Sequence, residues 1–313
     1  MAAKADTTIR KIRSLEIQGA RNVAKAAIAA FSDSAAHSKA RSQAALRKEL
    51  ESTANALSES RPTEPMMRNL VEESLRFATK TLGAKTAGSK SIDSAKKAIS
   101  DHADLIIARM DEDAKRLSSY GARIIPADAL VLTHCHSSTT TMILKEAARH
   151  NKGMKVVCFE TRPRFQGRTT AAELAKAGLD VTLAVDGAMT MFMKKADIVI
   201  VGADSVTSRG DLINKIGTST LAHIARMNDV SFYSAAELSK YSPMTIFGNL
   251  EKIEERDHGE VWDKPPKGVK IKNPAFEATA AKYINGYVTE AGVIPPQSFF
   301  TLASEKLGIK LYE

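Results

Sequence analysis

The strongest constraint on the fold is a change in sequence pattern near residue 127. Before this point apolar residues recur at helical spacing, as in Ile9 and Ile12, with almost no strand pattern. After it, short apolar runs alternate with amphipathic stretches, which is typical of a mainly parallel sheet with helices on both faces. The sequence therefore predicts an α/β protein. A helical domain, residues 1–122, precedes a Rossmann-like, doubly wound catalytic domain, residues 123–313.

The same patterns predict individual elements. Helices are expected over residues 42–57, 66–82 and 92–117, and strands over residues 129–133, 155–160, 180–185, 197–202 and 230–234. The last stretch of about 50 residues contains Pro265-Pro266 and Pro295-Pro296, and it is expected to be irregular and to wrap back onto the sheet.

Composition limits the class of protein. A chain of 313 residues with 43% hydrophobic and 26% charged residues is typical of a two-domain globular protein. No apolar run reaches the ~18–20 residues of a membrane span, so no membrane partner is expected. The first residues, Met1 to Asp6, lack the apolar core of a signal peptide, which predicts a cytoplasmic protein. Cys135 and Cys158 could in principle pair, but Cys158 falls inside the apolar strand Lys155–Phe159, where a buried, reduced thiol is expected.

The net charge of +9 is unevenly distributed, because residues 1–125 hold 22 Lys+Arg against 15 Asp+Glu, a balance of +7. Such an excess fits either a polyanion-binding surface or a solvated helical surface. The solvated surface is favoured, since no aromatic side chains are interleaved with the basic ones as stacking on nucleic acid requires. A specific nucleic-acid partner is therefore not expected, and polyanion binding remains the weaker hypothesis.

The sequence contains no complete nucleotide-binding motif of the two common kinds. The segment Gly83–Ser91 resembles a phosphate-binding P-loop, but it has one residue too many before Lys90 and no strand precedes it. It is interpreted as a linker between helices. No G-x-G-x-x-G motif follows a strand, so a dinucleotide cofactor is not expected either.

Polar clusters follow the ends of the predicted strands. They are Thr133–Ser138, Glu160–Arg168, Gly202–Ser205 and Ile213–Thr218. Open α/β sheets bind their ligands at this edge, so these clusters are expected to converge on one rim. One thiol, one carboxylate and several basic and hydroxyl groups would then face each other, as a site for a phosphorylated small molecule requires.

Cys135 is the candidate reactive thiol of this rim. The hydroxyl-rich residues after it, beginning with Ser137 and Ser138, predict a helix N-terminus, which binds phosphate and lowers the pKa of a nearby thiol. The alternative is a small apolar residue at a strand end. His134 and His136 flank Cys135, but in a strand they point away from it and no further ligands are suitably spaced, so no metal is expected.

Asp204 is the candidate acid. It follows a strand that is expected to be buried on both faces, and poor solvation would raise its pKa. The alternative is an aspartate that caps a turn or a helix. Asn214, Lys215 and Lys240 supply a carboxamide and two ammonium groups that suit hydroxyls and phosphate.

Taken together, these segments resemble one superfamily. It unites archaeal ribose-1,5-bisphosphate isomerase, methylthioribose-1-phosphate isomerase and the alpha, beta and delta regulatory subunits of translation initiation factor two B. The resemblance covers nearly the whole chain and rests on Thr133-His134-Cys135, Glu160–Pro163, Gln166-Gly167, Gly202–Ser205, Asn214–Thr218, Ala236-Glu237, Lys240, Asn273–Phe276, Thr289–Gly292 and Pro295.

The resemblance implies a cofactor-independent isomerase that converts ribose 1,5-bisphosphate to ribulose 1,5-bisphosphate in nucleotide metabolism. Asp204 would protonate the ring oxygen, and Cys135 would move a proton from C2 to C1. The resemblance also implies a homodimer or larger homo-oligomer and a nucleotide activator. Because the regulatory subunits generally lack the thiol or the aspartate, an isomerase is favoured. A non-catalytic archaeal subunit in translation initiation is the alternative.

The resemblance further implies which residues bind the substrate. They are Gly19, Ala20, Arg21, Arg61, Ser137, Ser138, Asn214, Lys215 and Lys240. The isomerases carry an arginine at the position of Gln18, whose neutral amide cannot make a charge-assisted bidentate contact with phosphate. Arg21, one turn along the helix, is the candidate replacement.

Overall fold

The computed structural model describes residues 3–83, 91–249 and 251–309. The chain forms two compact units, residues 1–112 and 113–313. Helix α5 (Ile92–Arg123) belongs to the first unit over most of its length and to the second in its last turns. The boundary expected from the sequence, between residues 122 and 123, falls at the end of this helix.

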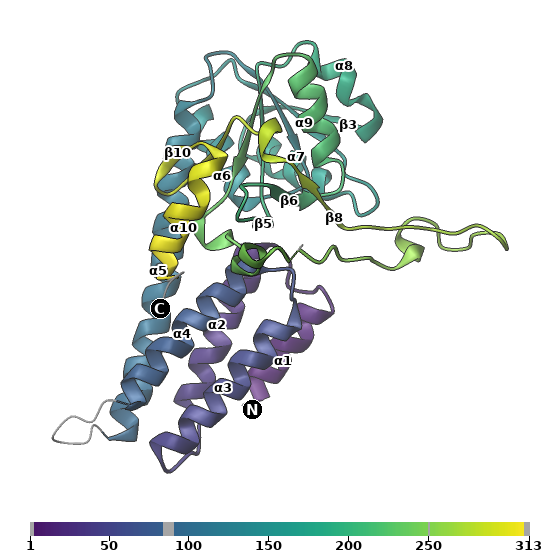
Figure 1. Ribbon diagram of the computed structural model, residues 1–313. Helices are drawn as coiled ribbons and strands as arrows, with labels where there is room; N and C mark the ends of the chain where they lie inside the picture. The colour runs from purple at the N-terminus through teal and green to yellow at the C-terminus, as the bar shows by residue number, and fades with distance from the viewer. Residues whose placement is uncertain (1–2, 84–90, 250, 310–313) are drawn as a thin grey trace. The chain divides into compact units, whose positions relative to one another are not determined.

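The first unit is helical, as the sequence predicts (Figure 1). With α5 it contains α1 (Ala3–Arg13), α2 (Ala20–Ala36), α3 (Gln43–Ser60) and α4 (Pro65–Gly83). Helix α3 begins where Ser42 Oγ accepts a hydrogen bond from the Ala45 amide at 3.2 Å, the usual role of a serine N-cap. Residues 84–90 of the segment that resembles a P-loop lie outside the described residues, so its interpretation as a linker stays a prediction.

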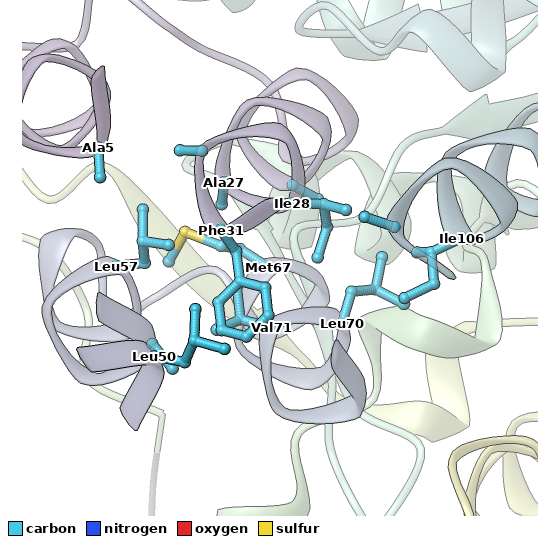
Figure 2. Close-up of a cluster of buried hydrophobic side chains, with 14 of the residues drawn as sticks. Ala5, Ala27, Ile28, Phe31, Leu50, Leu57, Met67, Leu70, Val71 and Ile106 are labelled. Carbon is cyan, nitrogen blue, oxygen red and sulfur yellow. The ribbon is translucent and has the colours of Figure 1, made fainter. Parts of the chain in front are cut away.

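The core of the first unit is built from apolar faces at helical spacing (Figure 2). Helix α2 is rich in alanine, which lets its neighbours approach closely, and it inserts Phe31 as the largest fully buried side chain of this cluster. Leu50 and Leu57 come from α3, and Met67 comes from α4. These contacts across three helices make the cluster the main source of stability of the unit.

The second unit is organised around a seven-stranded sheet of order β10-β9-β7-β4-β1-β2-β3, parallel except for β10. Its strands are β1 (Leu130–His134), β2 (Lys155–Phe159), β3 (Asp180–Ala184), β4 (Ile198–Val201), β7 (Ser231–Ala235), β9 (Gly286–Thr289) and β10 (Gly292–Ile294). Five of these strands coincide with the predicted ones, and the α/β class is confirmed.

Helices cover both faces of this sheet (Figure 1). One face packs against α8 (Met189–Met193), α9 (Thr218–Met227) and α10 (Phe299–Leu307). The other packs against α6 (Ser138–Ala148), α7 (Gln166–Lys176) and the end of α5. Successive strand residues such as Val131 and Leu132 enter opposite cores, which explains why the central strands are continuously apolar.

A second, antiparallel sheet of order β5-β6-β8 was not predicted. It consists of β5 (Ser205–Val206), β6 (Leu212–Lys215) and β8 (Phe276–Thr279). Asn214 and Lys215 therefore lie within a strand, and their placement after a strand end was wrong. The irregular C-terminal stretch was also wrong in part, because it contains β8, β9, β10 and α10. These short strands depend on pairing with neighbours rather than on their own pattern.

Short 3₁₀ helices complete the second unit. They are η1 (Asp186–Ala188), η2 (Leu238–Lys240), η3 (Pro243–Phe247), η4 (His258–Glu260), η5 (Ala281–Tyr283) and η6 (Pro296–Ser298). Between η3 and β8 the chain extends from its sheet as a long irregular arm (Figure 1). Over the described parts of the chain, no helix combines the length and apolarity needed to cross a bilayer.

The helical core provides the first prediction. Phe31→Ala removes a fully buried ring, so it is expected to lower the free energy of unfolding by ~3–5 kcal/mol. Leu105→Ala, at a side chain that is 67% exposed in the same unit, is the matched control and should change it by less than ~0.5 kcal/mol. Urea unfolding followed by circular dichroism compares the two, and equal shifts would contradict the packing described here.

Candidate active site

The candidate site lies where the strand order of the large sheet reverses. From β1 the chain proceeds to β2 and β3 on one side, and it then crosses to β4 on the other side of β1. The carboxyl ends of β1 and β4 border the crevice in which such sheets bind ligands. Cys135 follows β1 and Asp204 follows β4. Their charges act on each other, since Asp204 raises the pKa of the Cys135 thiol.

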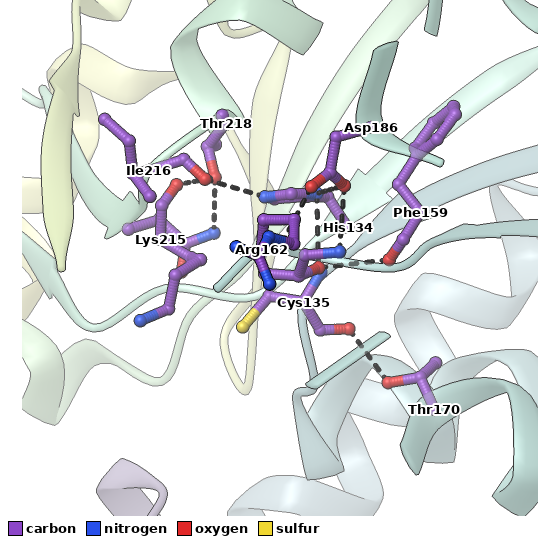
Figure 3. Close-up of polar contacts among 12 residues, drawn as sticks. His134, Cys135, Phe159, Arg162, Thr170, Asp186, Lys215, Ile216 and Thr218 are labelled. Atoms are coloured by element: carbon purple, nitrogen blue, oxygen red, sulfur yellow. Dashed lines mark hydrogen bonds and ion pairs between the residues drawn. The ribbon is translucent and has the colours of Figure 1, made fainter. Parts of the chain in front are cut away.

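Hydrogen bonds hold Cys135 in a left-handed backbone conformation, with φ at 67°. Its amide donates to Thr161 Oγ1 at 2.9 Å, and its carbonyl accepts from Thr170 Oγ1 at 2.9 Å. Thr161 is left-handed too, and the amides of Thr161 and Arg162 donate to the Asp186 carboxylate at 2.8 and 2.7 Å. The loops after β1, β2 and β3 are thereby joined (Figure 3).

His134 links this network to the small sheet. Its Nε2 lies 2.8 Å from the Ile216 carbonyl, and its Nδ1 lies 3.4 Å from Thr161 Oγ1. Burial lowers the pKa of His134, so the ring is neutral and Nε2 donates to the carbonyl. His136 bonds Thr170 through Nδ1 at 3.1 Å. Both imidazoles that flank Cys135 therefore support the loop.

The thiol is not activated in the way that the sequence suggested. Burial raises the pKa of Cys135 to about 11, Lys215 is the largest opposing influence, and Asp204 raises it further. The predicted lowering by a helix N-terminus was wrong. Helix α6 begins at Ser138, after the cap of Ser137, and desolvation outweighs the influence of the helix.

Lys215 is the ammonium group that acts most strongly on the thiol. It is 6% exposed, and its Nζ lies 4.7 Å above the ring of Phe276. Burial lowers its pKa, whereas Cys135 and Asp204 raise it. Figure 3 shows the Cys135 thiol and the Lys215 amine extending to the same side of the network. The Cys135 thiol, the Asp204 carboxylate and the Lys215 ammonium group thus form one electrostatically linked group, the reactive cluster.

Other predicted residues surround this cluster. Ser137 caps α6 by accepting from the Thr140 amide at 3.2 Å, and Ser138 is the first residue of the helix. A Cβ on Gly202 would lie 2.6 Å from Ser137 Cβ, so the close approach of the β4 end requires glycine. Asn214 Nδ2 donates to Thr218 Oγ1 at 3.0 Å.

Lys240 is a buried cation beside the start of α6. Its Nζ lies 3.2 Å from Glu237 Oε2, and the other oxygen of this carboxylate accepts from Thr139 Oγ1 at 3.2 Å. Both charged side chains are less than 5% exposed, at 4% and 2%. The charge of Lys240 is therefore offset locally by Glu237, unlike a cation held ready for a phosphate alone.

The remaining predicted residues belong to the first unit. Gly19, with φ at 82°, is the N-cap of α2, and Ala20 is its first residue. Arg21 donates to the Met110 carbonyl at 2.8 Å and to Asp111 Oδ1 at 3.0 Å. Its guanidinium thus joins α2 to α5, and its role as a phosphate ligand stays a prediction.

Two further side chains of the first unit bear on phosphate binding. Gln18 is exposed and donates from Nε2 to the Leu15 carbonyl at 2.7 Å, which closes the turn before α2. Arg61 is buried, with Nε 3.4 Å from Glu64 Oε1. Arg61 is therefore ionically compensated within its own unit.

Sequence reasoning missed three contributors to the site. Thr161 and Asp186 hold the loop of Cys135, as described above. Arg256 lies within range of the reactive cluster, because it lowers the pKa of both Cys135 and Lys215. Arg256 occupies the irregular arm, where no strand or helix pattern relates it to the sheet. Thr161 stood inside a quoted motif, but only the fold reveals its bond to Cys135.

A cavity of about 310 Å³ adjoins the hydrogen-bonded network rather than the thiol. His134, Asp186 and Gly217 line it on the sheet side, and Lys272 and Asn273 line it on the side of the arm. Neither Cys135 nor Asp204 is among its lining residues. The reactive cluster is therefore distinct from this hollow.

Fold and site together define an α/β protein with an N-terminal helical unit and a thiol–carboxylate pair at the switch point of its sheet. Residues 16–296 match the Initiation factor 2 subunit family, and the chain belongs to this family.

Its relatives include enzymes. Ribose 1,5-bisphosphate isomerase of Methanocaldococcus jannaschii is 38% identical over 96% of this chain and 94% of its own length. Four further archaeal proteins of this name are 35–37% identical. Methylthioribose-1-phosphate isomerase of Desulforudis audaxviator is 35% identical over 79% of this chain and 74% of its own.

Among solved structures, the translation initiation factor eIF-2B of Pyrococcus horikoshii OT3 superposes with a TM-score of 0.80 at 28% identity. The match covers 95% of this chain and 98% of the other. The fold is thus common to proteins of both names. The sequence relatives favour an isomerase over a regulatory subunit.

The electrostatics of the cluster predict how the thiol reacts. Because iodoacetamide attacks the thiolate and the pKa of Cys135 is about 11, its alkylation should still accelerate ~10-fold per pH unit above pH 9. Asp204→Asn should speed the reaction at pH 8, since it removes a charge that raises the pKa. Lys215→Met should slow it, since it removes a charge that lowers the pKa.

Peptide mass mapping would measure this rate separately from that of Cys158, whose pKa burial raises to about 12. Asp180→Asn is the control, because it removes the same charge from an exposed residue at the start of β3. It should leave the alkylation rate of Cys135 unchanged. A plateau below pH 9, or equal effects of the two aspartate variants, would show that the cluster is not coupled as described.

Proposed function

We propose that this sugar-phosphate isomerase converts ribose 1,5-bisphosphate to ribulose 1,5-bisphosphate. The observation that carries the proposal is the placement of Cys135 and Asp204 at the switch point beside Lys215, in a chain whose archaeal relatives are named for this reaction. Such a cluster contains the acid and the base that an aldose–ketose conversion needs.

The reaction begins with ring opening, because the 1-phosphate locks the sugar as a ring. Asp204 gives its proton to the ring oxygen as the bond from this oxygen to C1 breaks. Cys135 takes the proton from C2, which leaves an enol with a hydroxyl at C2. Cys135 then returns a proton to C1, and the C2 hydroxyl returns one to Asp204. The ketone forms and both side chains regain their starting states.

The charges around Cys135 support this assignment and set its pH dependence. With a pKa of about 11, the thiol is mostly protonated at neutral pH, so only a small fraction of the enzyme holds the base. Lys215 favours the thiolate, because its positive charge lowers the pKa of Cys135. The fraction of thiolate should therefore rise as the pH increases above neutrality.

We assign substrate binding to the other predicted residues. Ser137, Ser138, Asn214, Lys215 and Lys240 offer hydroxyl, amide and ammonium groups in the second unit. Gly19, Ala20, Arg21 and Arg61 offer backbone amides and guanidinium groups in the first. Binding of a phosphorylated pentose needs no organic cofactor or metal in this scheme. The homo-oligomer, the nucleotide activator and the cytoplasmic location stay predictions.

Turnover tests the proposed function directly. Purified protein should form ribulose 1,5-bisphosphate from ribose 1,5-bisphosphate in the presence of a chelator. Cys135→Ser and Asp204→Asn should each reduce kcat at least ~10³-fold, as loss of an essential base or acid does. Cys158→Ala, at a buried thiol in β2, is the matched control and should keep most of the activity. Full activity in both site variants would refute the assignment.

Gln18 permits a separate test of phosphate binding in the first unit. Gln18→Arg adds a charged donor next to Gly19, so it should lower KM several-fold and leave kcat nearly unchanged. If Arg21 already supplies this charge, Gln18→Arg should have little effect and Arg21→Ala should raise KM sharply. Steady-state kinetics with a check of folding by circular dichroism separates the two outcomes. No change in KM for either variant would remove this segment from the phosphate site.

A further inference from the structure

Arg256 is fixed in place by backbone pairing rather than by a helix or a long strand. Its amide donates to the Asn273 carbonyl at 2.9 Å, and the neighbouring Ala275 amide donates to the Glu254 carbonyl at 2.8 Å. Ala275 in turn accepts from the Ile216 amide at 3.2 Å, directly after Lys215. These backbone hydrogen bonds connect the arm to the small sheet next to Lys215.

The guanidinium of Arg256 is buried with incomplete hydrogen bonding. The side chain is 7% exposed, and its Nε lies 3.2 Å from Glu254 Oε1 without the alignment of a hydrogen bond. Within the described parts of the chain, neither Nε nor Nη1 has a hydrogen-bond acceptor. Buried donors in this state are rare in folded proteins, because desolvation without an acceptor is unfavourable. Such donors indicate a position where a ligand oxygen can accept a hydrogen bond.

The location of these donors relates them to the reactive cluster. Arg256 lowers the pKa of the Cys135 thiol and of the Lys215 ammonium, so its charge lies near both groups. Lys240 is paired with Glu237 at 3.2 Å, as Arg256 is with Glu254, but Nε and Nη1 of Arg256 also lack a hydrogen-bond acceptor within the described residues. A guanidinium with open donors suits a phosphate group, because it can donate to two of the phosphate oxygens at once.

We propose that Arg256 is an anion-binding residue of this site and that its guanidinium donates hydrogen bonds to a phosphate group of the sugar substrate near Cys135 and Lys215. The identity of the sugar rests on the proposed function. The binding of a phosphate group near the thiol does not, and it can be tested without turnover.

The first experiment uses inorganic phosphate as the probe and alkylation of Cys135 by iodoacetamide as the readout. A phosphate group held by Arg256 adds negative charge near the thiol and blocks access to it. Phosphate should therefore slow alkylation of the wild-type protein several-fold, and chloride at equal ionic strength should not. Arg256→Gln should abolish the effect of phosphate, and Arg256→Lys should keep part of it. Arg226→Gln, at an exposed arginine of α9, is the matched control and should behave as wild type.

The second experiment uses the isomerase assay. Arg256→Gln should raise KM for ribose 1,5-bisphosphate by ~10–1000-fold, the range for loss of one charged contact, with a smaller change in kcat. Its melting temperature without ligand should be unchanged or higher, since the variant removes the unbonded Nε and Nη1. A lower melting temperature with KM unchanged would show a structural role and overturn the proposal.

The two experiments separate the proposals from one another. If wild type shows no turnover but phosphate protects Cys135 in an Arg256-dependent way, the anion site stands and the substrate assignment fails. If wild type turns over and Arg256→Gln keeps both the wild-type KM and the phosphate effect, the isomerase stands and the role of Arg256 fails.

Discussion

The site depends on the left-handed backbone of Cys135, which two threonine hydroxyls hold in place. A non-glycine residue in this conformation costs ~1–3 kcal/mol, so neighbouring structure must enforce it. Asp186 contributes indirectly: its carboxylate accepts from two successive amides of the loop that contains Thr161, and Thr161 in turn binds Cys135. A carboxylate that follows β3 thereby fixes the direction of a thiol that follows β1. The parallel sheet brings the loops after β1, β2 and β3 to one edge, and these hydrogen bonds fix the orientation of Cys135 within that edge.

Burial has opposite consequences for the two central groups. It raises the pKa of Cys135 and lowers that of Lys215, so it favours the neutral form of each. Each group also favours the charged form of the other, so the protonation of one affects the protonation of the other. A phosphorylated ligand adds negative charge to this balance and would disfavour the thiolate. Cations close to the thiol are therefore needed for substrate binding and base formation to coexist.

The sequence predicts the large features of the fold because the central strands are buried on both faces. This burial makes runs such as Val156 to Phe159 continuously apolar, and the run locates the polar rim that follows it. The small sheet could not be predicted from the sequence, because β5 has only two residues and gains its stability from pairing with β6. Thr161 and Asp186 act through backbone bonds to residues distant in sequence, which no local pattern records. The raised pKa of Cys135 could not be predicted either, because desolvation of the thiol depends on the folded site around it.

The arm between η3 and β8 adds a charge to the site from outside the sheet. Strand ends place Cys135 and Asp204, and any chain with this sheet has such ends. The pairing of the arm with residues 273–275 brings a buried guanidinium within electrostatic range of the thiol. The chain resembles both isomerases and a translation initiation factor, so the fold by itself does not decide the activity. Chemistry then follows from which acids, bases and cations occupy the rim, and Arg256 adds a cation from outside the layered sheet.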